Sequence, residues 1–257
     1  MAVEIRLLGT VDAVVDGRRT DLGHARQRCV LVALAAEANQ PVSFDQLVTR
    51  VWADRPPRRP RAALYGYLYR LRQLLADAHD VALVRRTGCY ELVVDPDAVD
   101  LRRFERLLAA ARRAGTDGER LALFDTALGL WRGEPFAGLD TPWLGALRVM
   151  AEQQRFLAET DRTDVVLRSG RCDEELARLA ARAAVHPLDE RVAAQLVLAL
   201  HRTGRTAEAL GHYQRVRRLL ADELGTDPGT ALRAVHREVL RTSTDDRLAG
   251  HRRVLHA

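Results

Sequence analysis

The N-terminal part of the chain changes from an alternating apolar pattern to a helical one. Apolar and polar residues alternate over 3–8 and 11–15, which predicts half-buried strands, and Asp16–Gly17 is typical of a hairpin turn. From 25 to about 37 the apolar residues recur at helical spacing. Ser43 then precedes FDQLVTRVW, which predicts a short helix with Ser43 as its N-terminal cap.

A proline-rich basic loop leads into a third helix. The segment ADRPPRRP at 53–60 is expected to be a loop, because prolines remove hydrogen-bond donors and disfavour a helix before them. After it, leucines recur along one stripe, so residues 61–75 are predicted to form a helix that turns these leucines inward. The stripe consists of Leu64, Leu68, Leu71 and Leu75.

A second hairpin follows the third helix. VALVRR and CYELVV read as strands over 81–94 and are joined by a turn at Thr87–Gly88. Strands, three helices and a hairpin in this order predict a winged helix-turn-helix. Such a domain places its third helix in the major groove of DNA and its hairpin tip near the DNA backbone.

Beyond DPDAVD at 95–100 the pattern is helical, with breaks rich in glycine and proline. SGR at 169–171 recurs 34 residues later as TGR at 203–205, a spacing typical of tetratricopeptide repeats. We therefore expect a mainly α fold in three parts. These are an N-terminal winged helix-turn-helix with small antiparallel sheets at 1–95, a C-terminal all-α tetratricopeptide-like helical repeat domain at 98–242, and a polar tail at 243–257.

The face of the third helix opposite its leucines carries the candidate chemistry. Two small residues, Ala62 and Gly66, would let the helix axis approach the base pairs closely. The longer side chains at 69, 70 and 73 would then reach base edges, while the basic loop and hairpin tip would bind phosphates. The candidate DNA-binding residues are Arg58, Arg59, Arg61, Ala62, Tyr65, Gly66, Tyr69, Arg70, Arg72, Gln73, Arg85, Arg86 and Thr87.

The same helix taken alone also fits a solvated amphipathic helix whose tyrosines cover neighbouring apolar surface. We favour DNA binding because three neighbouring segments occur in the order that a winged helix requires. They are the short capped helix, the basic loop before the third helix and the basic hairpin tip. Tyr67 lies beside the leucine stripe and is expected to pack against the core rather than to contact DNA.

Arginine supplies all 40 basic residues, and the chain contains no lysine. A GC-rich genome explains this bias, so the number of arginines is not evidence for nucleic acid binding. Their position is more informative. Between residues 50 and 86 nine arginines stand against three aspartates, an excess of six charges that exceeds the net charge of +5 of the whole chain. Such a local excess is expected of a polyanion-binding surface.

Composition also argues against other classes. A P-loop and a protein kinase both need a lysine on the phosphates. The chain has no HExxH or GxSxG motif and no Cys/His cluster with metal-ligand spacing, so we expect no catalytic residue, no metal and no cofactor. Three widely spaced cysteines, no membrane-spanning apolar run and no secretion signal predict a cytoplasmic protein that does not contact a membrane.

Several longer segments carry a resemblance to a known family. LLGTVDAVVDGRR, QPVSFDQLVTRVWADRPP and ALYGYLYRLRQLL resemble the Streptomyces antibiotic regulatory protein family, and LWRGEPFAGL and ELGTDPG resemble its bacterial transcriptional activation domain. The N-terminal part is similar to OmpR-type output domains. In that class the RLR of the third helix and the basic residue before the wing turn contact DNA, which implies Arg70, Arg72 and Arg85 here.

The resemblance implies a transcriptional activator of an antibiotic biosynthetic gene cluster. Such proteins bind direct repeats in double-stranded DNA near the promoter −35 element, as head-to-tail homodimers, and recruit RNA polymerase holoenzyme through its sigma factor and other subunits. Tyr65 and Gly66 depart from the usual residues of the third helix, so the repeat sequence is expected to differ.

Two alternatives stay open. A repressor would use the same fold and the same DNA chemistry, and only the family resemblance favours activation. A helical-repeat scaffold that binds an acidic protein would show no preference for a DNA sequence.

Overall fold

The computed structural model describes residues 3–76 and 78–254, except for the side chains of residues 243–254. The chain divides into two compact units, Met1–Ala158 and Glu159–Ala257. The described residues are mainly helical, with two small antiparallel sheets of three strands each, as predicted.

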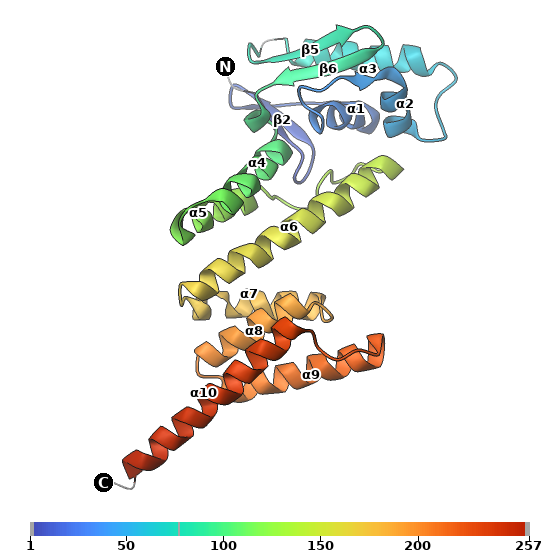
Figure 1. The fold of residues 1–257 in the computed structure, drawn as a ribbon. Coiled ribbons are helices and arrows are strands. Elements are labelled where there is room, and N and C mark those ends of the chain that lie inside the picture. The colour runs from blue at the N-terminus through green and yellow to red at the C-terminus, as the bar shows by residue number, and fades with distance from the viewer. Residues whose placement is uncertain (1–2, 77, 255–257) are drawn as a thin grey trace. The chain divides into compact units, whose positions relative to one another are not determined.

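The first unit combines short strands with helices (Figure 1). Its strands are β1 (Val3–Arg6), β2 (Asp12–Val15), β3 (Arg18–Thr20), β4 (Val42–Ser43), β5 (Val81–Arg86) and β6 (Cys89–Val94). Its helices are α1 (Ala25–Ala35), α2 (Phe44–Trp52), α3 (Pro60–Leu74), the 3-10 helix η1 (Pro96–Ala98), α4 (Asp100–Arg113), α5 (Asp117–Leu128) and most of α6 (Pro142–Arg168).

The three helices of the predicted helix-turn-helix are α1, α2 and α3. The backbone N–H of Gln46 donates to the Ser43 hydroxyl at 3.1 Å, and the N–H of Ser43 donates to the Gln46 side chain at 2.8 Å. This capping box confirms Ser43 as the start signal of α2. The predicted end of α1 at about 37 was too late: the helix ends at Ala35, and the next backbone N–H groups, those of Glu37 and Ala38, donate to carbonyls three residues back, as in a tight turn.

Both predicted hairpins form. β2 and β3 turn at Asp16–Gly17, where both residues have positive φ, and they pair with β1 in the order β1-β2-β3. The second hairpin, β5–β6, turns at Thr87–Gly88, with φ of +73° at Gly88, and β4 joins it in the order β4-β6-β5. This hairpin is the wing of the winged helix-turn-helix.

A buried carboxylate fastens the N-terminal sheet to the helices that follow the wing. Asp100, at the start of α4, is 3% exposed and accepts the backbone N–H groups of Leu7 at 2.7 Å and Leu8 at 3.1 Å. Arg132 completes the cluster with an ion pair at 2.7 Å. Burial raises the pKa of Asp100 above its ordinary value, while these donors act in the opposite direction. Backbone hydrogen bonds from Arg132 to Leu8 and from Phe136 to Leu7 extend this attachment.

The second unit repeats one helical motif. It contains the end of α6, followed by α7 (Cys172–Val185), α8 (Glu190–Arg202), α9 (Thr206–Leu224) and α10 (Thr230–Val254). Gly170 and Gly204 have nearly equal φ values, +79° and +80°, and the arginine after each occupies the N-cap position of the next helix. Leu179 and Tyr213, which stand at matching positions, are both buried. The predicted 34-residue repeat is therefore confirmed.

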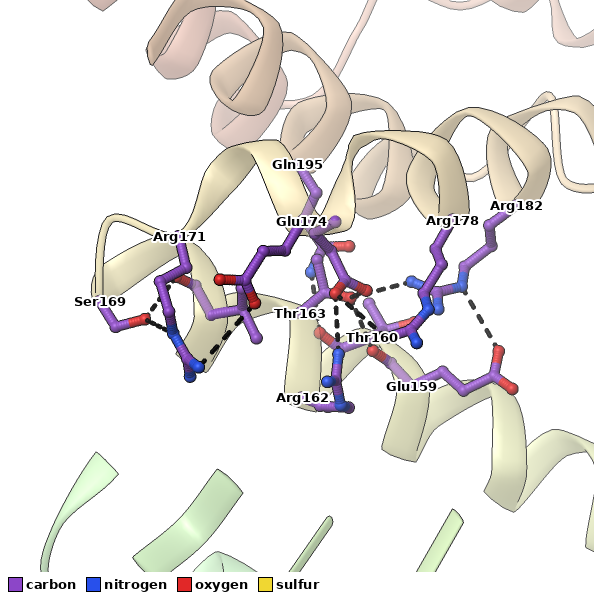
Figure 2. Close-up of polar contacts among 12 residues, drawn as sticks. Glu159, Thr160, Arg162, Thr163, Ser169, Arg171, Glu174, Arg178, Arg182 and Gln195 are labelled. Carbon is purple, nitrogen blue, oxygen red and sulfur yellow. Dashed lines mark hydrogen bonds and ion pairs between the residues drawn. The ribbon is translucent and has the colours of Figure 1, made fainter. Parts of the chain in front are cut away.

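Polar contacts between α6, α7 and α8 support the first repeat (Figure 2). Glu175 is 2% exposed and pairs with Arg162 at 2.8 Å. Arg182 donates to Thr163 at 3.0 Å and lies 3.4 Å from Glu159, as Figure 2 shows. Because a buried carboxylate is costly unless paired, the ion pair with Arg162 offsets the cost of burying Glu175.

Helix α10 extends to Val254. The side chains of the predicted polar tail at 243–257 lie outside the described residues. None of the helices in the described ranges has the length and apolar character needed to span a membrane. The described side chains also contain no group of three or more His, Cys, Asp or Glu residues that could hold a metal ion.

Replacing Asp100 tests the attachment of the N-terminal sheet. Asp100→Ala leaves two buried N–H groups without their acceptor and removes the shorter of the two ion pairs that Arg132 forms within the described residues, so we expect the free energy of unfolding to fall by about 3 kcal/mol. Tryptophan fluorescence in urea follows the first unit, because all three tryptophans lie there (Trp52, Trp131, Trp143). Asp54→Ala removes an exposed carboxylate as the control, and an equal effect of the two variants would contradict the role of Asp100.

Candidate nucleic-acid interface

Helix α3 has one buried and one exposed face. Its first residue is Pro60, whose missing N–H and fixed φ suit the first helical position. The predicted leucine stripe is confirmed: Leu64, Leu68 and Leu71 are at most 1% exposed, and Leu75, just after the helix, is 4% exposed. The opposite face therefore points to solvent.

The thirteen candidate residues lie on this face and around it. Arg58 and Arg59 precede α3, Arg85 and Arg86 end β5, Thr87 lies in the wing turn, and the others belong to α3. Twelve are exposed, and Gly66 is half-buried. A Cβ atom added at Gly66 would meet nothing within 4 Å. The absence of a side chain there is therefore not required by packing within the chain.

Arg72 connects α3 to the wing. Its Nε and Nη2 atoms donate to the carbonyl oxygen of Leu83 on β5 at 3.1 and 2.9 Å. The sequence predicted that Arg72 lies on the DNA-facing side of α3, and its side chain is exposed. The structure shows in addition that it contacts the wing. Because both hydrogen bonds converge on one carbonyl oxygen, they hold β5 of the wing close to α3.

A series of aromatic and cationic contacts joins α2, α3 and the wing. The guanidinium of Arg61 lies 5.0 Å from the ring centre of Phe44, and that ring lies 5.9 Å from Tyr65. The guanidinium of Arg85 lies 5.6 Å from the centre of the Tyr65 ring. Phe44 thus contacts Arg61, and Tyr65 contacts Arg85. The sequence did not predict that Phe44 belongs to this surface, because contacts between different elements leave no local sequence pattern.

Arg70 and Tyr67 lie at the border between interface and core. The Tyr67 ring packs edge-on against His24 at 5.0 Å and lies 6.0 Å from Trp52, so its predicted packing role is confirmed. The guanidinium of Arg70 lies 5.8 Å from the Tyr67 ring and donates a long hydrogen bond, 3.5 Å, to the buried Gln27 side chain. Arg70 is therefore oriented but weakly held.

The remaining candidates differ in how far their groups are already engaged. Arg86 pairs with Glu91 across the wing at 2.5 Å, which neutralises much of its charge. Within the described residues, five of the polar candidate side chains form no hydrogen bond, ion pair or ring contact with the protein. They are Arg58, Arg59, Tyr69, Gln73 and Thr87.

Comparison with known proteins gives matches along nearly the whole chain. A family model described as the bacterial transcriptional activator domain matches residues 99–240. AfsR of Streptomyces coelicolor is 36% identical over 243 residues, which are 93% of this chain and 24% of AfsR. DnrI of Streptomyces peucetius is 32% identical over 251 residues, which are 93% of this chain and 92% of DnrI.

A solved structure of EmbR from Mycobacterium tuberculosis has a similar fold. The TM-score is 0.87 at 31% identity, and the match covers 98% of this chain and 70% of that chain. The chain spans about a quarter of the AfsR proteins, 24% and 25%, and 63% of EmbR in the sequence comparison. The relatives named here are described as regulatory or transcriptional regulatory proteins.

Proposed function

Because the chain belongs to the Streptomyces antibiotic regulatory protein family of transcriptional regulators, we propose that it binds duplex DNA sequence-specifically and activates transcription. The observation that carries the proposal is the outward face of α3. There exposed arginines surround two small residues, Ala62 and Gly66, beside a basic wing tip. A helix of this kind fits the major groove, where an arginine pairs with a guanine through two hydrogen bonds.

The contacts within the protein support a division of roles among the candidates. Tyr69, Arg70 and Gln73 project from the exposed face and are proposed to contact bases. The arginines of the preceding loop and of the wing, with Thr87, are proposed to bind phosphates, Arg86 less strongly because Glu91 already pairs with it. Arg61, Tyr65 and Arg72 are proposed to border the interface.

For the whole protein we propose three parts: a DNA-binding domain at 1–95, an activation domain at 98–242 and a tail at 243–257. The activation domain would recruit RNA polymerase through its sigma factor and other subunits. Head-to-tail pairs of the protein would occupy direct repeats near the −35 element of promoters in an antibiotic gene cluster. This activity places the protein in the cytoplasm. The family match at 99–240 and the likeness to DnrI and AfsR support this proposal.

Two assays test the function directly. Footprinting on the promoters that flank its own gene should give protected direct repeats, and a scrambled duplex should bind far more weakly at the same salt concentration. Transcription in vitro from such a promoter should increase when the protein is added to RNA polymerase holoenzyme. Decreased transcription would make the protein a repressor, and equal binding of both duplexes would refute sequence-specific binding.

Arg70 should contribute to sequence readout. Arg70→Ala should weaken binding of the protected repeat by about 1–3 kcal/mol and relax the preference at one or two base pairs. Fluorescence anisotropy with single-base variants of the repeat measures both effects. Arg18→Ala, which removes an exposed arginine from β3, is the matched control. Equal affinities for the Arg70→Ala variant and the unmodified protein would exclude Arg70 from the interface.

Gly66 separates helix stability from DNA binding. Gly66→Ala should stabilise α3 by roughly 1 kcal/mol, because alanine favours helices and its Cβ has open space. The same methyl group should weaken DNA binding if the helix axis lies close to the bases. Gly145→Ala in α6 also has open space and serves as the control that changes stability alone. Undiminished DNA affinity of the more stable Gly66→Ala variant would refute close approach at this position.

A further inference from the structure

The second unit contains a surface pocket of about 490 Å³ beside α9 and α10. Its volume falls within the usual range of small-molecule sites. The pocket does not belong to the proposed DNA interface, which lies entirely in the first unit. Its lining residues are Tyr213, Thr230, Arg233, His236 and Arg237.

The pocket is positively charged and has no internal counter-ion. Arg233 and Arg237 stand one turn apart on α10, and both are exposed. In the part of the chain that the structure describes, neither guanidinium forms a hydrogen bond or an ion pair, and no acidic residue lines the pocket. This differs from many arginines of the second unit, such as Arg205, which pairs with Glu208 at 2.6 Å.

Two stacked rings form a rigid wall of the pocket. The rings of Tyr213 and His236 are 3.7 Å apart between centroids and inclined by only 2°. Burial lowers the pKa of His236, and the nearby charge of Arg217 acts in the same direction, so the imidazole is neutral at neutral pH. The wall is therefore an uncharged aromatic surface next to two cations.

The start of α10 adds positive potential. Thr230 begins this helix and lines the pocket, and the first turn of a helix presents N–H groups that carry partial positive charge. Glu190 on α8 accepts the preceding N–H, that of Gly229, and offsets part of this potential from outside the pocket. The two guanidinium groups keep the net charge of the lining positive.

We propose that this pocket binds the phosphate group of a small phosphorylated molecule. Two guanidinium groups one helical turn apart suit an anion with several oxygen acceptors, and arginine matches phosphate geometry better than lysine does. The volume of the pocket exceeds that of one phosphate group. The organic part of the ligand would therefore pack against the aromatic wall. This ligand site goes beyond the DNA-binding proposal and does not depend on it.

Calorimetric titration of the full chain without DNA tests the proposal. The probes are inorganic phosphate, adenosine monophosphate and adenosine, at constant ionic strength. We expect saturable binding of phosphate and of the monophosphate at one site per chain, tighter for the monophosphate, and no binding of adenosine. Arg233→Gln and Arg237→Gln should each weaken binding roughly tenfold, which is the loss of one charge-assisted hydrogen bond.

Arg218→Gln on α9, which removes an exposed arginine outside the pocket, is the matched control and should leave binding unchanged. Circular dichroism melting of every variant shows that the second unit stays folded. Equal losses in the control, or equal binding of adenosine and its monophosphate, would overturn the proposal. The proposal would also be overturned if no probe bound while Arg233→Gln and Arg237→Gln weakened binding of a DNA duplex, because the two arginines would then contribute to DNA binding.

Discussion

The candidate interface depends on the burial of one face of α3. Leu64, Leu68 and Leu71 pack into the core that α3 forms with α1 and β5. Because side chains on a helix follow one another at a fixed angle, burying this stripe also fixes the direction of every other side chain on α3. Rotating the helix by one residue would bury an arginine without a partner, which costs several kcal/mol. The outward direction of the arginines is thus a consequence of leucine burial and needs no DNA.

A second set of contacts joins α3 to the wing. Arg72 directs two donors at the carbonyl oxygen of Leu83, and Tyr65 lies beside Arg85. The family resemblance implies that Arg72 contacts DNA, whereas in the structure Arg72 donates hydrogen bonds to β5 of the wing. These roles are compatible, because a guanidinium has five N–H donors and one carbonyl uses only two of them. If Arg72 contacts both the wing and DNA, the position of α3 in the major groove would also determine where the wing tip lies on the DNA.

Local patterns in the sequence were enough to predict the helices α1, α2 and α3 and the two hairpins of the first unit. The leucine stripe, the capping of α2 by Ser43 and the turn at Gly88 each depend on residues a few positions apart. Contacts between distant residues were not predictable. Asp100 binds Leu7 and Leu8, and Phe44 meets Tyr65 and Arg61, without any spacing that signals these pairs. The exposure of the candidate residues followed from the pattern, but which of them are already engaged did not.

The abundance of arginine makes its pairing more informative than its number. In the repeat, Arg171 and Arg205 stand at matching helix starts and each lies near a glutamate three residues on, so each of these charges has a counter-ion within the chain. Within the described chain, Arg58 with Arg59 and Arg233 with Arg237 are neighbouring cations that have no such role. Their repulsion is weak in water and is relieved by an anion. The first pair lies on an open loop, which suits an extended polyanion, whereas the second lines a pocket and suits a small one.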